Sequence, residues 1–352
     1  MASLVVLLIV IGCVAYQYFK GTTVKAVATI IVIMCSSIAA FSYFELLADY
    51  FISRSISRQW AQPLFYVLLF IFAFALLQTV VNKLSRKSID LGHVPEIAGR
   101  CICGIVIGLL ISGVLLVALD MAPLSDKYPY QRFASNNTKP EMPGRVFPSA
   151  DGFVTGFFGL VSRGGLSGQR SFSVVHPSFV DESFLNRLGA SGGVSINTKT
   201  QAIEAPKKDA AWLAPENLTD TTNSPISSKT GHTLTMVRVG VKQRELIDAG
   251  NFTCSQVRLI CRRKNVAAEG LSGKGINVYP IGYLNTAGKL QLKRLSEKNR
   301  LESGTSSGSA VWVDFAFYVP NDYTPVLVAF KQNNIAEIPK VASLGGASSP
   351  EL

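Results

Sequence analysis

Three histidines of this sequence could act as the general base of a serine hydrolase, namely His93, His176 and His232. In a serine hydrolase, the histidine takes a proton from a serine that is held in a tight turn, and an acidic residue orients the ring. His232 is followed by Asp248 and then by Ser306 and Ser309, which is a His-Asp-Ser order. Both serines lie in the segment GTSSGSA, which lacks the Gly-Asp-Ser-Gly turn of such a nucleophile.

The other two histidines have no better partners in the sequence. Asp181 and Ser191 follow His176 too closely to form a triad with the spacing that a fold requires. His93 lies in a loop between two apolar stretches, on the side opposite to the one we expect for the polar tail. We therefore predict no catalytic residue in this chain.

Cysteine spacing and glycine-rich segments indicate neither a metal site nor a cofactor site. Cys101-x-Cys103 lacks the two-residue spacer and the second ligand pair of a zinc site. Ser162–Gln169 is glycine-rich but lacks the Gly-Lys-Ser/Thr ending of a phosphate loop. Cys254 and Cys261 could form a disulfide in an oxidising compartment, but their odd spacing on a single strand would point them to opposite faces.

The secondary structure that would position a catalytic or binding residue differs between the first third of the chain and the rest. The chain has 352 residues and 48% hydrophobic residues. Long apolar stretches, most of which approach or reach the ~20 residues that a helix needs to cross a bilayer, fill its first third. They are Leu4–Phe19, Val24–Phe44, Pro63–Val81 and Cys101–Leu119. We predict an all-α membrane domain of four helices over residues 1–122.

Small residues recur every four positions in the fourth stretch, at Gly104, Gly108 and Ser112. This spacing places them on one helix face and lets another helix approach closely. We predict a helix-packing face here, which serves contacts within the chain or between copies. Gly113 lies off this face, and we expect it to be less crowded.

The basic residues of the loops predict the orientation, because Lys and Arg prefer the cytoplasmic side. One side carries Lys20, Lys25, Lys83, Arg86, Lys87 and Arg100, and the other carries Arg54, Arg58, Lys127 and Arg132. This bias places both termini and the polar tail outside the cytoplasm. Glu45 and Asp49, near the outer end of the second stretch, are expected at the membrane interface beside Arg54 and Arg58.

Several local features of the first 122 residues resemble the colicin V production family, which are small four-helix membrane proteins of bacteria. They are the step Tyr18–Gly21, the basic residue Lys25, the cluster Phe41–Glu45, the run Val80–Leu84 and the repeat Gly104-x-x-x-Gly108. The chain departs from the family at two places: Arg100-Cys101 stands where the family often has an acidic-basic pair, and Ile111-Ser112 stands where it often has Arg-Gly. The resemblance implies a role in production or export of a peptide toxin, and the family is not an established class of enzymes.

The rest of the chain predicts a mainly-β, antiparallel, sandwich-like soluble domain over residues 161–340. Short runs rich in Val, Ile, Phe and Tyr indicate its strands. They are Thr233–Lys242, Val257–Arg263, Ile276–Leu284, Leu290–Leu295, Val311–Tyr318 and Pro325–Lys331. The last two runs resemble those of immunoglobulin-like modules on bacterial surfaces.

The remaining segments of the tail are polar or irregular. Residues 123–160 are predicted to be a linker, in which Asp151–Leu160 forms either an amphipathic helix against the membrane or the first core element of the tail. Residues 189–231 are predicted to be a long flexible loop, and residues 341–352 a disordered tail.

Together these features predict a non-enzymatic, multi-pass protein of the bacterial inner membrane with an extracytoplasmic β domain. Its partners would be the lipid bilayer, a second copy or another membrane protein at the fourth helix, and an envelope polymer or protein attracted by the net charge of +11. No nucleic-acid module accompanies this charge. A membrane-anchored hydrolase with an unrecognised site and an accessory subunit of an export system are the alternatives.

Overall fold

A computed structural model describes residues 2–56, 58–84, 92–134, 138–164, 171–199, 201–227, 229–264, 271, 273–301 and 309–339. The chain divides into two compact units. The first comprises residues 1–132 and 143–160, and the second comprises residues 133–142 and 161–352. Arg86, Lys87, Ser306 and the predicted tail at 341–352 lie outside the described residues.

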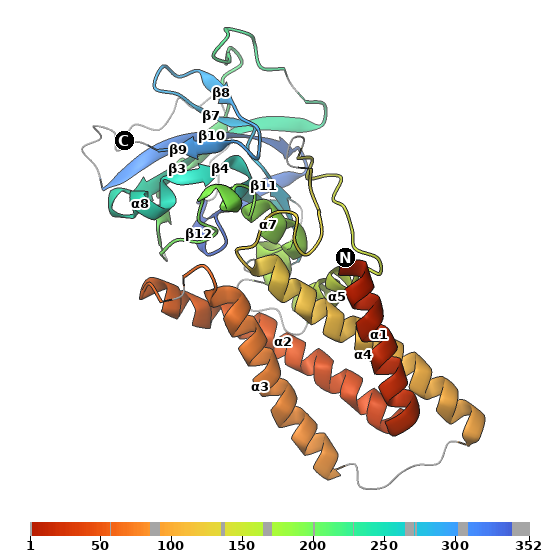
Figure 1. Ribbon diagram of the computed structural model, residues 1–352. Coiled ribbons are helices and arrows are strands. Elements are labelled where there is room, and N and C mark those ends of the chain that lie inside the picture. Colours follow the sequence, from red (N-terminus) through yellow and green to blue (C-terminus); the bar gives the residue numbers. More distant parts are fainter. Residues whose placement is uncertain are drawn as a thin grey trace. The chain divides into compact units, whose positions relative to one another are not determined.

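Four long helices make up most of the first unit (Figure 1). They are α1 (Ala2–Lys20), α2 (Thr23–Ser53), α3 (Ala61–Leu84) and α4 (His93–Met121). All four are long and apolar enough to cross a membrane, which confirms the predicted helical membrane region. The second and fourth helices are longer than the apolar stretches that predicted them. Arg100, which we expected in a loop, therefore lies inside α4, and His93 begins that helix.

The helices turn apolar side chains outward, as expected of a surface that meets lipid and not water. Large exposed apolar residues occur on every one of them, among them Leu4, Ile31, Leu68, Phe72 and Ile102. Burial differs strongly between the helices. In its most apolar stretch, 61% of α4 is buried, against 6% of α3. The fourth helix is thus the central one, and the other helices pack around it.

A fifth helix, α5 (Ala150–Arg163), belongs mainly to the helical unit. Its Phe158 stacks on Phe41 of α2 at 4.7 Å between ring centroids, and Val154 is buried. The sequence left open whether this segment is an amphipathic helix or a core element of the tail. The structure shows a helix that packs with the membrane-spanning helices.

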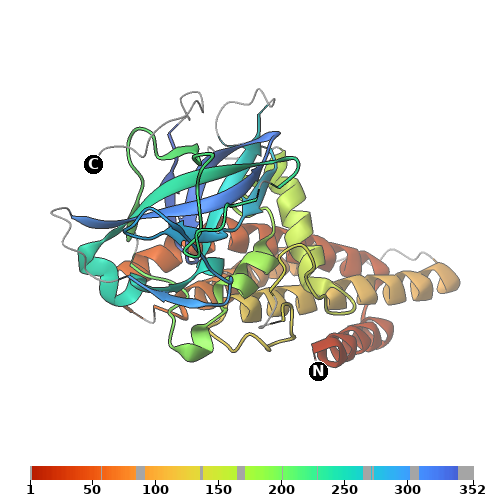
Figure 2. The same cartoon turned by 90° about the horizontal axis from the view of Figure 1, so that it is seen from above.

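Strands are longer and more numerous than helices in the described residues of the second unit, and they pair in antiparallel sheets, which confirms the predicted mainly-β part. The first sheet has the order β1-β3-β10-β7-β8, with β2 also paired to β3. Its strands are β1 (Ile203–Glu204), β2 (Ala211–Leu213), β3 (His232–Lys242), β7 (Gly282–Leu284), β8 (Leu290–Leu292) and β10 (Ala310–Pro320). The long strands β3 and β10 run side by side over eleven residue pairs, from Ala310↔Lys242 to Pro320↔His232 (Figure 2).

The second sheet has the order β12-β11-β5-β6. Its strands are β5 (Val257–Arg263), β6 (Gly275–Val278), β11 (Tyr323–Phe330) and β12 (Asn334–Glu337), and a separate pair joins β4 (Asn251–Thr253) to β9 (Lys298–Arg300). Short helices complete the unit, namely α6 (Phe172–Val175), α7 (Phe179–Asn186), α8 (Leu246–Ala249), η1 (Ala190–Gly192), η2 (Gln243–Glu245) and η3 (Cys254–Gln256).

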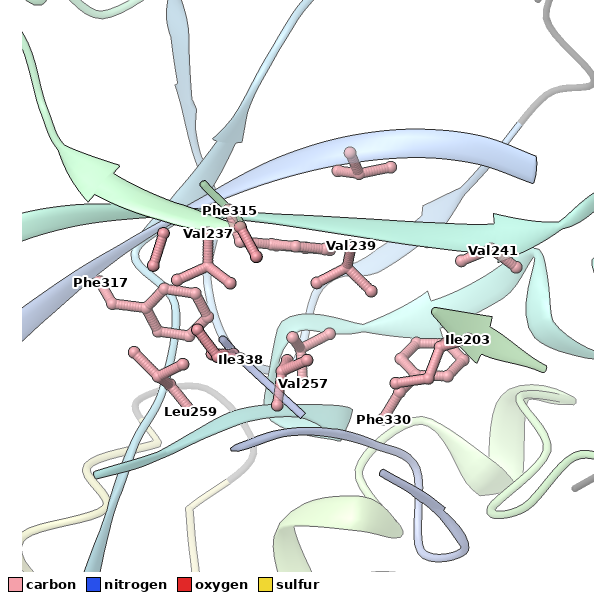
Figure 3. Close-up of a cluster of buried hydrophobic side chains, with 14 of the residues drawn as sticks. Ile203, Val237, Val239, Val241, Val257, Leu259, Phe315, Phe317, Phe330 and Ile338 are labelled. Carbon is pink, nitrogen blue, oxygen red and sulfur yellow. The ribbon is translucent and has the colours of Figure 1, made fainter. Parts of the chain in front are cut away.

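Side chains from both sheets meet in one hydrophobic core (Figure 3). Alternate residues of β3, Val237 and Val239, face Phe317 of β10 and Leu259 of β5 in this cluster. Arg238 lies between the two valines and therefore points to the other face, where it forms a two-bond ion pair with Asp314 of β10 at 2.6 and 2.7 Å. Each fully buried side chain of this size contributes roughly 1.5–3 kcal/mol, so this core dominates the stability of the unit.

Some predicted boundaries in the second unit differ from the structure. Residues 189–231, predicted to be a loop, contain β1 and β2, and Trp212 of β2 is only 4% exposed. These two short strands carry little pattern of their own, and pairing with β3 holds them in place. The predicted strand 276–284 is broken at Pro280 into β6 and β7, which belong to different sheets. Cys254 and Cys261 are both free and buried, so the structure forms no disulfide between them.

Candidate functional site

An open pocket of about 890 Å³ lies in the β domain. This volume falls within the ~300–1,000 Å³ range of ligand-binding pockets in proteins. Its walls are built by the edge strand β6, the break between β6 and β7, the segment after β8, the facing ends of β3 and β10, and the start of α7. The pocket therefore depends on elements that are far apart in the sequence.

Positive charge predominates in the lining of the pocket. Lys229, Lys274 and Arg294 are exposed there, and Lys293 is paired with Glu297 at 2.5 Å. The acidic residues of the lining are Glu141 and Asp181. An opening with one predominant sign of charge raises the local concentration of ligands of the opposite sign.

Tyr279 lines the same pocket at the break after β6. Its hydroxyl oxygen is buried and has no hydrogen-bond partner among the described residues. Burial raises the pKa of the phenol, the carboxylate of Glu182 raises it further, and Arg258 opposes the change. This hydroxyl thus stays protonated.

The buried carboxylate of Glu182 forms a hydrogen bond with Asn277, a residue of the pocket wall. Glu182 of α7 has one oxygen, Oε2, at 2.7 Å from His176 Nδ1 and at 3.2 Å from Arg258 Nη1. Its other oxygen, Oε1, accepts hydrogen bonds from the Ser178 backbone N–H at 3.1 Å and from Asn277 Nδ2 at 2.6 Å. Asn277 belongs to β6 and also lines the pocket, so this cluster sets the position of the pocket edge.

The cluster keeps Glu182 ionised although its side chain is buried. Burial raises the pKa of this carboxyl, but the charge of Arg258, the His176 ring and the hydrogen bonds outweigh burial and lower the pKa to about 2. Arg258 also donates to the Val175 carbonyl at 2.6 Å. The charges are thus compensated, and the arrangement joins the α6–α7 segment to β5 and β6.

In the membrane region, the predicted packing face of α4 lies against α1. A Cβ atom built on Gly104 would lie 2.7 Å from Val14 Cα, and one built on Gly108 would lie 2.6 Å from Val10 Cα. Ser112 is 1% exposed. The two backbones thus touch where the glycines lie, and this contact is within one chain.

Gly113 was expected to be less crowded, and the structure corrects this. A Cβ atom at Gly113 would collide with the carbonyl of Ala150 and lie 2.5 Å from Val154 Cγ2. The reason is helix α5, which occupies a second face of α4. The sequence offered a helix over Asp151–Leu160 as one alternative, but it did not show that this helix packs against α4.

The loop and interface charges take different positions. Lys20 at the end of α1 and Lys25 at the start of α2 are exposed, whereas Glu45 and Asp49 are half-buried within α2. Arg100 pairs with Glu96 one turn earlier at 3.1 Å. Glu96 also accepts a hydrogen bond from the Thr23 backbone N–H at 2.9 Å and so joins the starts of α2 and α4.

Two buried aspartates of the helical unit were missed in the sequence. Asp120 near the end of α4 and Asp151 at the start of α5 are both fully buried. The hydroxyl of Tyr130 donates to Asp151, and Arg132 Nη1 lies 3.7 Å from the same carboxylate and 2.7 Å from the Tyr130 hydroxyl. Burial, followed by the charges of Asp120 and Asp151, raises the pKa of Tyr130. The cluster fixes the segment that follows α4.

Comparison with known families concerns the helical unit. Residues 2–137 match the family model described as colicin V production protein. The N-terminal region is thus similar to colicin V production proteins. The match covers less than half of the 352 residues and does not extend into the β sheets. No curated protein and no solved structure matches the chain.

Two departures from the family pattern can now be placed in the helical unit. Arg100 and Cys101 lie in α4, and Arg100 has its acidic partner, Glu96, in the same helix. Ser112 is enclosed beside Gly113 at the level where α5 packs. The charged position of the family's pair corresponds to Ile111, which is half-buried, and the small position corresponds to Ser112.

No motif or spacing in the sequence indicated that the pocket residues of the β domain lie together. Lys229, Lys274 and Arg294 are scattered over more than sixty positions and follow no motif. His176 and Glu182 are six positions apart, but Arg258 lies 82 positions after His176. Only the pairing of β5 with β6 brings Arg258 beside Asn277. A sequence can show that such residues exist but not that they meet.

The glycine contact gives a first prediction. Gly108→Leu should force α1 away from α4 and destabilise the domain by about 1–3 kcal/mol, because a well-packed contact has no room for added atoms. The control is Gly12→Leu on α1, since a Cβ atom there meets nothing within 4 Å. The measurement is the thermal midpoint of both variants in detergent. Equal loss of stability in the two variants would show that the contact is not close.

The buried carboxylate gives a second prediction. Glu182→Gln should cost about 3–5 kcal/mol, because it leaves Arg258 in a buried site without its counter-charge. An ordinary glutamate has a pKa of about 4.3, whereas that of Glu182 is about 2 when folded. Its contribution is therefore complete above about pH 4.3 and is lost as the pH falls toward 2.

This second prediction is measured by tryptophan fluorescence during unfolding. In a Trp60→Phe background, the signal reports Trp212 and Trp312 of the β domain alone. Glu182→Gln should flatten the loss of stability between about pH 4.3 and pH 2, whereas exposed Glu216→Gln should keep the slope of the parent. An unchanged slope in Glu182→Gln would contradict the ionised, paired state of this carboxyl.

Proposed function

We propose that the chain is a non-enzymatic protein of the bacterial inner membrane whose extracytoplasmic β domain binds an acidic partner. The helical unit anchors the chain, and the β domain supplies the binding site. The basic pocket is the observation that carries this proposal, with Lys229, Lys274 and Arg294 exposed in its lining. An envelope polymer or a protein with a run of negative charges fits such a site.

The family match supports the membrane part of this function. The family description refers to production of colicin V, a peptide toxin, and we propose that this chain assists the production or export of such a peptide. In this proposal it acts as an accessory subunit and not as the transporter itself. The glycine face of α4 packs against α1 of the same chain, so we assign binding of the partner to the β domain.

The side of the membrane is the third prediction. The loop charges favour a β domain outside the cytoplasm. A cysteine introduced at exposed Pro225 should react with a membrane-impermeant maleimide in intact cells. A cysteine at exposed Lys25 should react only after permeabilisation, because this loop is expected to be cytoplasmic. The reverse pattern would place the β domain inside the cell.

The partner is the subject of the fourth prediction. A photo-crosslinking benzoylphenylalanine at His232, which lines the pocket, should capture a distinct acidic partner in intact cells. The same amino acid at Ile247, which is 89% exposed and outside the pocket, should not capture it. The charge reversals Lys274→Glu and Arg294→Glu together should abolish the adduct. An adduct that forms equally at Ile247, or that survives the charge reversal, would contradict the proposal.

A further inference from the structure

The pocket runs along the edge of strand β6. Four consecutive residues of this strand, Gly275, Ile276, Asn277 and Val278, line it. Consecutive residues of a strand point to opposite faces of the sheet. Ile276 and Val278 pack against the hydrophobic core, whereas Asn277 reaches Glu182 on the other face. A single pocket can contact all four residues only if it follows the edge of the strand.

The other edge of β6 has no strand partner in the described part of the chain. The second sheet ends at β6, which pairs with β5 through Val278↔Leu259 to Gly275↔Arg262. No other described backbone pairs with residues 275–278. An open edge presents a row of N–H and C=O groups, and such groups form hydrogen bonds with another extended chain.

We propose that an extended, acidic peptide segment of a partner protein adds to the edge of β6 as a further strand. This inference rests on the proposed function and names the form in which the partner binds. Strand addition gains affinity from main-chain hydrogen bonds, and side-chain pockets add specificity. β6 has four residues, which corresponds to an edge of roughly 13 Å.

The charges of the pocket select an acidic segment. Lys274 precedes the first residue of β6, and Arg294 lines the same pocket from the segment after β8. Lys229 is a third exposed cation of the lining. An acidic strand thus satisfies both the backbone edge and the basic side chains.

Peptide selection on the full-length chain in lipid nanodiscs tests this proposal. A displayed library of random linear ten-residue peptides is selected on the wild-type chain and counter-selected on the Lys274→Glu/Arg294→Glu variant. The enriched peptides should be net acidic and should bind the variant at least ten-fold more weakly. Lys207→Glu/Lys208→Glu, which reverses two exposed cations outside the pocket, should bind them as the wild type does.

Two further measurements separate strand addition from simple attraction of an anion. Methylation of alternate backbone nitrogens of an enriched peptide should abolish binding in one register and spare it in the other, because only one set of N–H groups faces β6. Bound peptide should slow hydrogen exchange of the amides of residues 275–278.

The outcomes distinguish this inference from the proposed function. Charge-dependent binding that tolerates methylation in both registers and leaves the β6 amides unprotected would overturn strand addition and leave the pocket as an anion site. Failure to enrich any peptide whose binding depends on Lys274 and Arg294 would overturn strand addition. If the photo-crosslink at His232 is then insensitive to the same charge reversal, the proposed function fails as well.

Discussion

The close approach of α1 and α4 at Gly104 and Gly108 is the contact on which the packing of the membrane region depends. Water does not drive helices together inside a bilayer, so association relies on close van der Waals contact. Glycine removes the side chain that would otherwise separate the backbones. Gly113 serves the same purpose toward α5, and α4 can therefore occupy the centre while the outer helices present apolar side chains to lipid.

In the β domain the apolar side chains lie inside and the polar ones outside, because its outer surface faces water. Alternate residues of the long strands fill one core, and the residues between them carry polar pairs such as Arg238 with Asp314. Where polar groups are buried, they are compensated. Glu182 receives four contacts from the backbone and from three side chains, and this allows a carboxylate to stay charged inside the domain.

Asn277 connects the stability of the β domain to its proposed function. Its amide donates to Glu182, and its own strand forms the edge of the basic pocket. The buried cluster therefore holds the edge of β6 in a defined position before any partner arrives. A preorganised edge reduces the entropy lost on binding, which is a general route to higher affinity. In the proposed function, the helical unit supplies the anchor, and the β domain outside the family match supplies recognition.

Local sequence patterns determined the class of each part. Apolar stretches of bilayer length predicted the four membrane helices, and alternating apolar residues predicted β3, β5, β10 and β11. Both patterns involve only residues that are close together in the sequence. The glycine spacing placed Gly104 and Gly108 on one face of α4 for the same reason. Such local patterns can be interpreted without information about the rest of the chain.

Only the tertiary structure decided which elements meet. It showed that α5 crowds Gly113, that β1 and β2 exist because β3 pairs with them, and that Pro280 sends one predicted strand into two sheets. It also brought His176, Glu182 and Arg258 together across more than eighty positions. Contacts between distant residues arise from packing and strand pairing, and a single sequence contains no local trace of them.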